Sequence, residues 1–362
     1  MVDWKNPPRL FIPGPVKVNE DVLQQLARPT LGHRGKEYAQ LHGEVIDMLR
    51  KLLLTNQSIF LSTSSASGIW EAAIRNCVAP GETVLCTMCG AFSDKWASVV
   101  RSCDRDADEL KVDWGKPILP DMLDKKLATG KYAAVTLVYS ETSTGLANPV
   151  AEISKMMKEK YPDVLVFVDC VSAMIGLPMK FDELGWDVAL ASVQKAFAIP
   201  PGLAVAVVSR RALEKSKNVP GRGYYFDFQE FAKKAEQNQT PTTPAIPHIM
   251  ALNYQCKKLV AEGIENVWKR HKKMGDFVRN WAKEKFDLFC DEKYASNTLT
   301  AIKNTRGINV AETISAVQKK HNTIFGNGYG KLKEGTFRIA HMGDITLNEL
   351  KELLGWIDEE IG

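Results

Sequence analysis

Six short apolar runs alternate with helix-like segments between residues 59 and 209. They read IFLSTS, TVLCTM, AAVTLVYS, VLVFVDC, DVALASV and GLAVAVVS. Their apolar residues are consecutive, which is typical of strands covered on both faces. Helical signals lie between the runs in SGIWEAAIRNCVAPG, DMLDKKLATG and PVAEISKMMKEKYP, each ended by Gly or Pro. The pattern predicts an α/β domain with a mostly parallel central sheet flanked by helices.

The pattern changes near residue 221, where GRGYYFDFQEF and QTPTTPAIP are rich in aromatic residues, Thr and Pro. From about residue 248 we expect two helices, a strand near TLTAI, a helix over VAETISAVQKKHN, a strand at FRIAHMG and a terminal helix. We therefore predict a large α/β domain over residues 17–247 and a smaller C-terminal α+β domain over residues 248–362. The Pro-rich arm 1–16 is expected to pack with the small domain or at a dimer interface.

Composition narrows the class of function. The chain has 362 residues, 45% of them apolar and 25% charged, and its net charge of +4 comes from 47 basic and 43 acidic residues without a single-sign block. These values predict a globular protein with a small-molecule partner, not a nucleic acid or a membrane. No signal peptide or run of roughly 20 apolar residues is visible, so we expect a cytoplasmic location.

The seven cysteines predict a reducing compartment and no metal site. Cys86 and Cys89 have redox or zinc spacing, but there is no second pair, and core thiols are the better interpretation.

Lys195 follows an apolar run, in SVQKAFAIPPG. Loss of hydration would favour its neutral, nucleophilic form, although a single lysine is more often a surface residue. In an open α/β sheet, ligands bind at the carboxyl ends of strands. Asp169 ends the run VLVFVD, where it could hold a proton on a heteroaromatic nitrogen or simply cap a helix.

Three other strand ends carry suitable groups. SSASGIWEAAI begins a helix whose first residues could receive a phosphate or form a plain N-cap. Phe92 could stack on a flat ring or belong to the core. SETSTG supplies hydroxyl groups or a polar turn. A phosphate cradle, a stacking ring, hydroxyls, an aspartate and a lysine in this order together indicate pyridoxal phosphate.

Eight segments carry a family resemblance over nearly the whole chain: IPGPVKV, LGHRGKEY, SSASGIWEAAI, SETSTG, VDCVSAMIG, SVQKAFAIPPG, TPTTPAI and FRIAHMGDIT. The sequence resembles the class V aminotransferases of the fold-type-I pyridoxal-phosphate enzymes, in particular the alanine-glyoxylate and serine-pyruvate branch. The resemblance implies a homodimer with shared active sites. It also implies transamination of alanine or serine with glyoxylate or pyruvate.

The resemblance assigns roles residue by residue. It implies that Lys195 forms the Schiff base, that Asp169 pairs with the ring nitrogen and that Arg338 binds the substrate α-carboxylate. Phe92 would stack on the ring, where relatives often have Trp, and Thr142 would contact the phenolic oxygen region. The phosphate would be held by Ser65, Ala66, Ser67 and Gln194, and by Thr240 or Thr243 of the neighbouring subunit.

Two alternatives stay open. LGHRGKEY also resembles the segment with which phosphoserine aminotransferases hold the substrate phosphate, which would make His33 and Arg34 substrate ligands and phosphoserine with 2-oxoglutarate the substrates. A non-catalytic protein that binds pyridoxal phosphate on the same fold is the more remote alternative.

Overall fold

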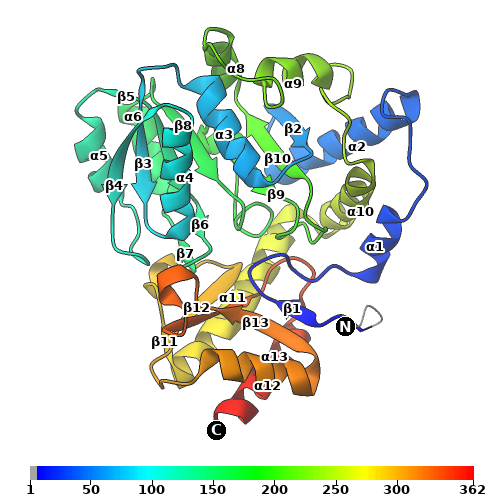
Figure 1. The fold of residues 1–362 in the computed structure, drawn as a ribbon, viewed down its shortest axis with the longest axis vertical. Helices are drawn as coiled ribbons and strands as arrows, with labels where there is room; N and C mark the ends of the chain where they lie inside the picture. Colours follow the sequence, from blue (N-terminus) through cyan, green and yellow to red (C-terminus); the bar gives the residue numbers. More distant parts are fainter. Residues whose placement is uncertain (1–5) are drawn as a thin grey trace.

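A seven-stranded sheet forms the centre of the larger part of the molecule (Figure 1). The computed structural model describes residues 6–362, so the first five residues of the predicted N-terminal arm lie outside the described residues. The strand order is β2-β10-β9-β8-β5-β3-β4. The strands are β2 (Ser58–Ser62), β3 (Thr83–Met88), β4 (Asp106–Lys111), β5 (Tyr132–Val138), β8 (Leu165–Asp169), β9 (Val188–Ser192) and β10 (Ala204–Val208).

The sheet is mostly parallel, as the consecutive apolar runs predict. Neighbouring strands from β9 to β4 run parallel, and β10 alone runs antiparallel to both of its neighbours. Alternate residues face opposite cores: Leu165 and Phe167 point into one apolar cluster, whereas Val166 and Val168 point into another. Both faces are therefore buried, which explains why these strands have no polar alternation.

Helices cover the two faces of this sheet. The core on one face includes buried residues of α2 (Lys36–Leu53), α5 (Pro120–Leu127), α6 (Val150–Lys160) and α10 (Ile246–Glu262). The core on the other face includes buried residues of α3 (Ala66–Cys77), α4 (Ala91–Ser102), α8 (Arg210–Lys217) and α9 (Phe228–Ala235). In α3 the buried residues at positions 66, 69, 70, 73, 74 and 77 follow the three-to-four-residue spacing of an amphipathic helix, and Ala72 and Asn76 are buried as well.

A five-stranded sheet of order β1-β13-β14-β12-β11 builds the smaller part, seen below the large sheet in Figure 1. Its strands are β1 (Arg9–Phe11), β11 (Asp287–Leu288), β12 (Leu299–Lys303), β13 (Thr323–Asn327) and β14 (Thr336–Ala340). Helices α11 (Ile264–Lys285), α12 (Val310–His321) and α13 (Leu347–Ile361) share an apolar core with it. The N-terminal strand β1 pairs in parallel with β13, and its Phe11 belongs to the same core.

Short elements complete the chain. They are α1 (Glu20–Leu26), α7 (Phe181–Leu184), the hairpin of β6 (Ser140–Glu141) and β7 (Leu146–Ala147), and the 3-10 turns Glu292–Tyr294 and Gly330–Leu332. Over residues 6–362, no helix combines the length and apolar character required to span a membrane.

The cysteines are buried in the core. Burial raises the pKa of Cys86 to about 11 and that of Cys89 to about 12, so both are protonated thiols at neutral pH. In the described part of the chain, no group of three His, Cys, Asp or Glu side chains is arranged to hold a metal ion.

Candidate active site

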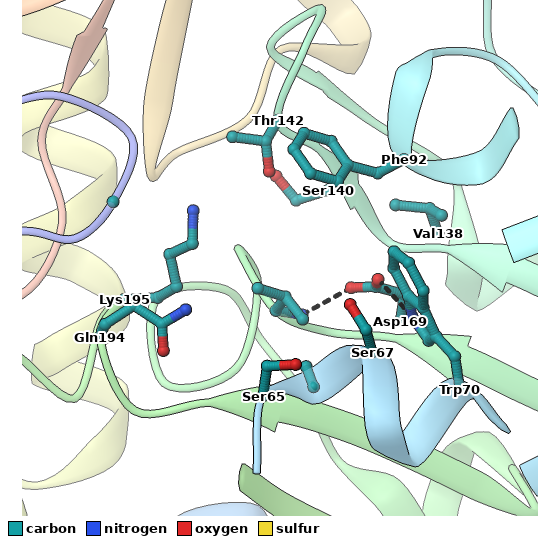
Figure 2. A pocket seen from close by; sticks show the side chains of 13 residues that line it. Ser65, Ser67, Trp70, Phe92, Val138, Ser140, Thr142, Asp169, Gln194 and Lys195 are labelled. Atoms are coloured by element: carbon teal, nitrogen blue, oxygen red, sulfur yellow. Dashed lines mark hydrogen bonds between the residues drawn. The ribbon is translucent and has the colours of Figure 1, made fainter. Parts of the chain in front are cut away.

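A cavity of about 220 Å³ lies at the carboxyl edge of the large sheet, where segments that follow β2, β3, β5, β8 and β9 meet (Figure 2). This is the edge at which ligands bind in open α/β sheets. The cavity is lined by Gly14, Ser65, Ala66, Ser67, Trp70, Phe92, Val138, Ser140, Thr142, Asp169, Val171, Gln194 and Lys195.

Asp169 is the last residue of β8 and is 3% exposed. The indole nitrogen Nε1 of Trp70 donates to its Oδ2 at 2.8 Å, and the backbone N–H of Val171 donates to its Oδ1 at 2.8 Å. Burial raises the pKa of Asp169 to about 7, although these two donors and the charge of Lys195 act in the opposite direction. The cavity therefore presents a fixed carboxyl group that gains or loses a proton near neutral pH.

Lys195 reaches the cavity from the side opposite Asp169 in Figure 2. The residue is 8% exposed, and its ammonium group donates to the carbonyl oxygen of Pro13. Burial lowers the pKa of Lys195 to about 8, and the charge of Arg338 lowers it further, while Asp169 opposes both. A neutral, nucleophilic amine is therefore accessible close to neutral pH.

The N-terminus of α3 opens onto the same cavity. Ser65 is its N-cap residue in an extended conformation, and within the described chain its side chain makes no capping hydrogen bond. Ala66 and Ser67 begin the helix and also line the cavity. Gln194 lies nearby with its Oε1 buried and without a hydrogen-bond partner among residues 6–362. Unpaired donors and hydroxyls at a helix N-terminus favour an anion.

Phe92 and Thr142 form the wall opposite α3. The buried carboxylate of Glu141 accepts the backbone N–H groups of Phe92 and Ser93, which fixes the first turn of α4 and with it the position of the phenyl ring. The Phe92 ring centroid lies 5.2 Å from that of Tyr329. Thr142 Oγ1 lies 2.6 Å from the hydroxyl of Ser172.

Arg338 stands on β14, beyond the lining of the cavity. Its Nε donates to the carbonyl oxygen of Asn327 at 3.0 Å, and its Nη1 donates to that of Thr142 at 3.3 Å. Burial lowers the pKa of Arg338 to about 10, so it keeps its charge at neutral pH. The contact with Thr142 places a cation at the edge of the site.

Residues 20–325 match the family described as aminotransferase class-V. The L-aspartate–glyoxylate aminotransferase of Paracoccus denitrificans is 31% identical to this chain, covering 93% of it and 87% of that protein. The chain belongs to this family. The serine–glyoxylate aminotransferase of Methylorubrum extorquens is 32% identical to this aminotransferase, and the match covers 96% of this chain and 89% of that relative.

A solved alanine–glyoxylate aminotransferase from Nostoc sp. has a TM-score of 0.94 to this aminotransferase at 25% identity, covering 100% of this chain and 97% of that one. The predicted fold class, a fold-type-I transferase, is thereby confirmed. The predicted family and type of enzyme are confirmed as well.

The structure gathers eight of the predicted residues of this aminotransferase around one cavity. They are Ser65, Ala66, Ser67, Phe92, Thr142, Asp169, Gln194 and Lys195. The five others lie outside its lining: His33, Arg34, Thr240, Thr243 and Arg338.

Arg34 donates to the carbonyl oxygens of Thr240 and Pro241 at 2.8 and 3.0 Å, so its guanidinium is engaged by the segment that holds both threonines. Thr240 is buried and its hydroxyl donates to the carbonyl oxygen of Thr242 at 2.7 Å. Thr243 is exposed. Of the two threonines, Thr243 is thus the one whose surface is open to another molecule.

The cavity also contains residues that the sequence reasoning missed: Gly14, Trp70, Val138, Ser140 and Val171. In the sequence, Trp70 has the spacing of a core position in an amphipathic helix. The one signal for a role at the cavity is that it lies one turn after Ser67, on the same side of α3. Ser140 is the first residue of SETSTG, and no feature of the local sequence distinguishes it from the other hydroxyl residues there. Gly14 comes from the N-terminal arm, which hydrophobic pattern alone does not place.

Proposed function

We propose that this aminotransferase uses pyridoxal 5′-phosphate to transfer the amino group of alanine or serine to glyoxylate or pyruvate in a ping-pong reaction. The observation that supports it most directly is one cavity in which a buried amine, Lys195, and a buried carboxyl group, Asp169, meet an open helix N-terminus. When bound, the cofactor would supply an aldehyde that condenses with amines and a cationic ring that withdraws electrons from the substrate α-carbon.

The donors of the cavity fit the phosphate of this cofactor. The first N–H groups of α3 and the hydroxyls of Ser65 and Ser67 would bind its oxygens. The side-chain amide of Gln194 also lines the cavity, and its Nε2 would donate to a phosphate oxygen; its buried Oε1, which has no partner in the described residues, is an acceptor and would not bind the phosphate. A helix dipole directed at the same point adds to the attraction for an anion.

Asp169 would hold a proton on the ring nitrogen. Trp70 and Val171 fix both carboxylate oxygens at 2.8 Å, so the carboxylate cannot turn away when the ring enters. A positively charged partner would lower the pKa of Asp169 from about 7 and keep it ionised. Phe92 would cover one face of the ring and help to exclude water.

Lys195 would act twice. As a neutral amine it would attach the cofactor, and once a substrate amine displaces it, it would move a proton from the substrate α-carbon to the C4′ carbon. The reduced pKa of about 8 suits this role, because the free amine is then a usable base near neutral pH. Arg338 would bind the substrate α-carboxylate with its planar guanidinium.

The choice of substrates is supported by the relatives. The names of three of them share glyoxylate as one substrate, while the amino acid is aspartate, serine or alanine. Phosphoserine with 2-oxoglutarate is less supported, because Arg34 is engaged by Thr240 and Pro241.

A homodimer would complete the site. Thr243 is exposed, and a second copy of the chain could direct it, or Thr240 after rearrangement of its turn, at the phosphate of the neighbouring cavity. His33, which is partly exposed beside Arg34, would lie in the same region.

The deciding experiment uses single amino acids without a keto acid. The purified, cofactor-loaded protein is mixed with alanine, serine, phosphoserine, aspartate or glutamate, and absorption reports conversion of the cofactor from the aldehyde to the amine form. Conversion by alanine or serine is the expected result. Conversion chiefly by phosphoserine or glutamate would assign phosphoserine and 2-oxoglutarate as the substrates instead. A protein that never develops the absorption of bound cofactor would contradict the proposal.

A further inference from the structure

A chain of buried hydroxyl groups leads from the cavity toward the smaller sheet. Ser140 Oγ lies 2.8 Å from Ser296 Oγ, and Ser296 Oγ lies 2.9 Å from Thr298 Oγ1. Thr298 Oγ1 in turn donates to the carbonyl oxygen of Ser172 at 2.6 Å. These four residues are 0–2% exposed, so water does not compete for their hydrogen bonds.

The last bond of the chain fixes the direction of the others. A carbonyl oxygen can only accept, so the single hydroxyl proton of Thr298 is used on Ser172. Ser296 must therefore donate to Thr298, and Ser140 must donate to Ser296. The proton of Ser140 points away from the cavity, and only its lone pairs remain for a ligand.

We infer that Ser140 is a specificity-determining hydrogen-bond acceptor whose direction is set by the positioning residue Thr298, and that it selects a proton-bearing group of the bound cofactor. The inference rests on the proposed cofactor. Ser140 and Thr142 both line the cavity, and Figure 2 shows both side chains on the same side of it as Phe92.

Thr142 differs from Ser140 in hydrogen-bonding character. Thr142 and Ser172 share one hydrogen bond between two hydroxyls, and no other bond of either hydroxyl is found in the described part of the chain. If Ser172 donates, the proton of Thr142 is available to the cavity. The cavity then offers a donor at Thr142 as well as an acceptor at Ser140, which suits a ligand that carries both an ionised oxygen and a protonated nitrogen.

Substitutions of the hydroxyl residues leave the charged groups around the cavity unchanged. Asp169 and Lys195 line it, and Arg338 and Glu141 flank it. Near the other end of the hydroxyl chain, Arg279 donates to the carbonyl oxygen of Ser296 at 2.8 Å.

Two histidines also lie close to Thr298. The backbone N–H of His341 donates to the carbonyl oxygen of Thr298, and burial lowers the pKa of His341 to about 3. His271 adjoins Gly176, which packs against Thr298, and burial lowers its pKa to about 4. Both imidazoles are therefore neutral across the range of the test.

The test measures the apparent pKa of the bound cofactor chromophore by absorption titration of the loaded protein. Thr298→Val leaves Ser296 without its acceptor, so Ser296 can donate to Ser140 and release the proton of Ser140 into the cavity. Because a donor disfavours a protonated ligand, the apparent pKa of the chromophore should fall by about 0.5–1 pH unit. Ser140→Ala and Ser296→Ala should lower it too, whereas Thr298→Ser should restore the wild-type value.

The matched control is Thr300→Val. Thr300 lies in β12, two residues after Thr298, is 3% exposed and forms a buried hydrogen bond of 2.9 Å with His341, but it does not belong to the chain of hydroxyl groups. The inference is supported if the apparent pKa of the chromophore is unchanged in Thr300→Val and lowered in Thr298→Val. Equal apparent pKa values in these two variants, or a raised apparent pKa in Ser140→Ala, overturn the inference while leaving the cofactor assignment intact. A wild-type protein with no chromophore overturns both.

Discussion

Lys195 is the residue on which the proposed chemistry depends. Lys195→Ala removes both the amine that attaches the cofactor and the base that moves the α-proton, so we expect turnover to fall by at least about a thousandfold. Steady-state rates with alanine and glyoxylate measure this. Lys217→Ala, on the exposed face of α8, serves as the control. Near-normal activity of Lys195→Ala would show that Lys195 does not take part in the reaction.

The low pKa of Lys195 has a kinetic consequence. Because only the neutral amine attacks an aldehyde, the rate at which cofactor-free protein takes up pyridoxal phosphate should rise with pH and level off above about pH 8. Stopped-flow absorption between pH 6 and 10 gives this profile. A rate that keeps rising toward pH 10.5 would mean an amine with an ordinary pKa.

Trp70 and Trp96 form a matched pair of tests. Their rings stack at 5.9 Å, but only Trp70 donates to Asp169, while Nε1 of Trp96 is buried with no partner in residues 6–362. Trp70→Phe should lower kcat about tenfold and raise the pKa of Asp169, because a hydrogen bond to a charged group is worth about 1.5–3 kcal/mol. Trp96→Phe should leave kcat and its pH profile unchanged. Equal losses in the two variants would indicate packing alone.

At the scale of elements, the segment after β1 places backbone against the reactive amine. Gly14 has φ +119°, and a Cβ there would lie 2.6 Å from Nζ of Lys195. Gly14→Ala should slow attachment of the cofactor at least about tenfold, since the side chain would displace the amine. Gly81→Ala is the control, because Gly81 has φ +82° with no atom within 4 Å of its Cβ position. It should cost stability only, by about 1 kcal/mol.

The elements that the sequence predicts well are those with a strong apolar signature. Strands β3, β5, β8, β9 and β10 have buried, apolar residues on both faces, and their runs are visible directly. Strand β4 reads DADELK and escapes detection, because it is an exposed edge strand that pairs only with β3. The hairpin of β6 and β7 has two residues in each strand, too few for a periodicity.

The same reasoning explains the candidate site. Residues at strand ends, such as Asp169 and Lys195, follow from the rule for parallel sheets. Trp70 and Ser140 do not, because their contribution depends on hydrogen bonds to residues distant in the sequence, Asp169 and Ser296. Motif resemblance supplies roles for Arg338 and Thr243, and these remain predictions.

At the scale of the whole molecule, the buried carboxyl group links folding to pH. The pKa of Asp169 is about 7 in the folded protein and 3.8 for an ordinary aspartate, so its contribution to stability is present below about pH 4 and is lost as pH rises through 7. In the cofactor-free state, the free energy of unfolding of Asp169→Asn should therefore rise relative to that of the wild type by on the order of 2 kcal/mol between pH 5 and pH 7. Urea unfolding at both pH values measures the difference, and a constant gap would contradict it.

Lys195 does not disturb this comparison below pH 7. Its folded pKa of about 8 lies below its ordinary 10.5, so its contribution is present above 10.5 and lost as pH falls through 8. Below about pH 7 the amine is protonated in both states, and its effect on stability no longer changes with pH.

The pairing of β1 with β13 determines when the site can form. The backbone of Asn6 is bonded to the side chain of Asn322, 316 positions away, and the same N-terminal segment carries the Pro13 carbonyl that binds the ammonium of Lys195. During synthesis the first strand has no partner until the ribosome has made almost the whole chain. The cavity is thus completed among the last steps of folding, and a shortened N-terminus would damage the site itself.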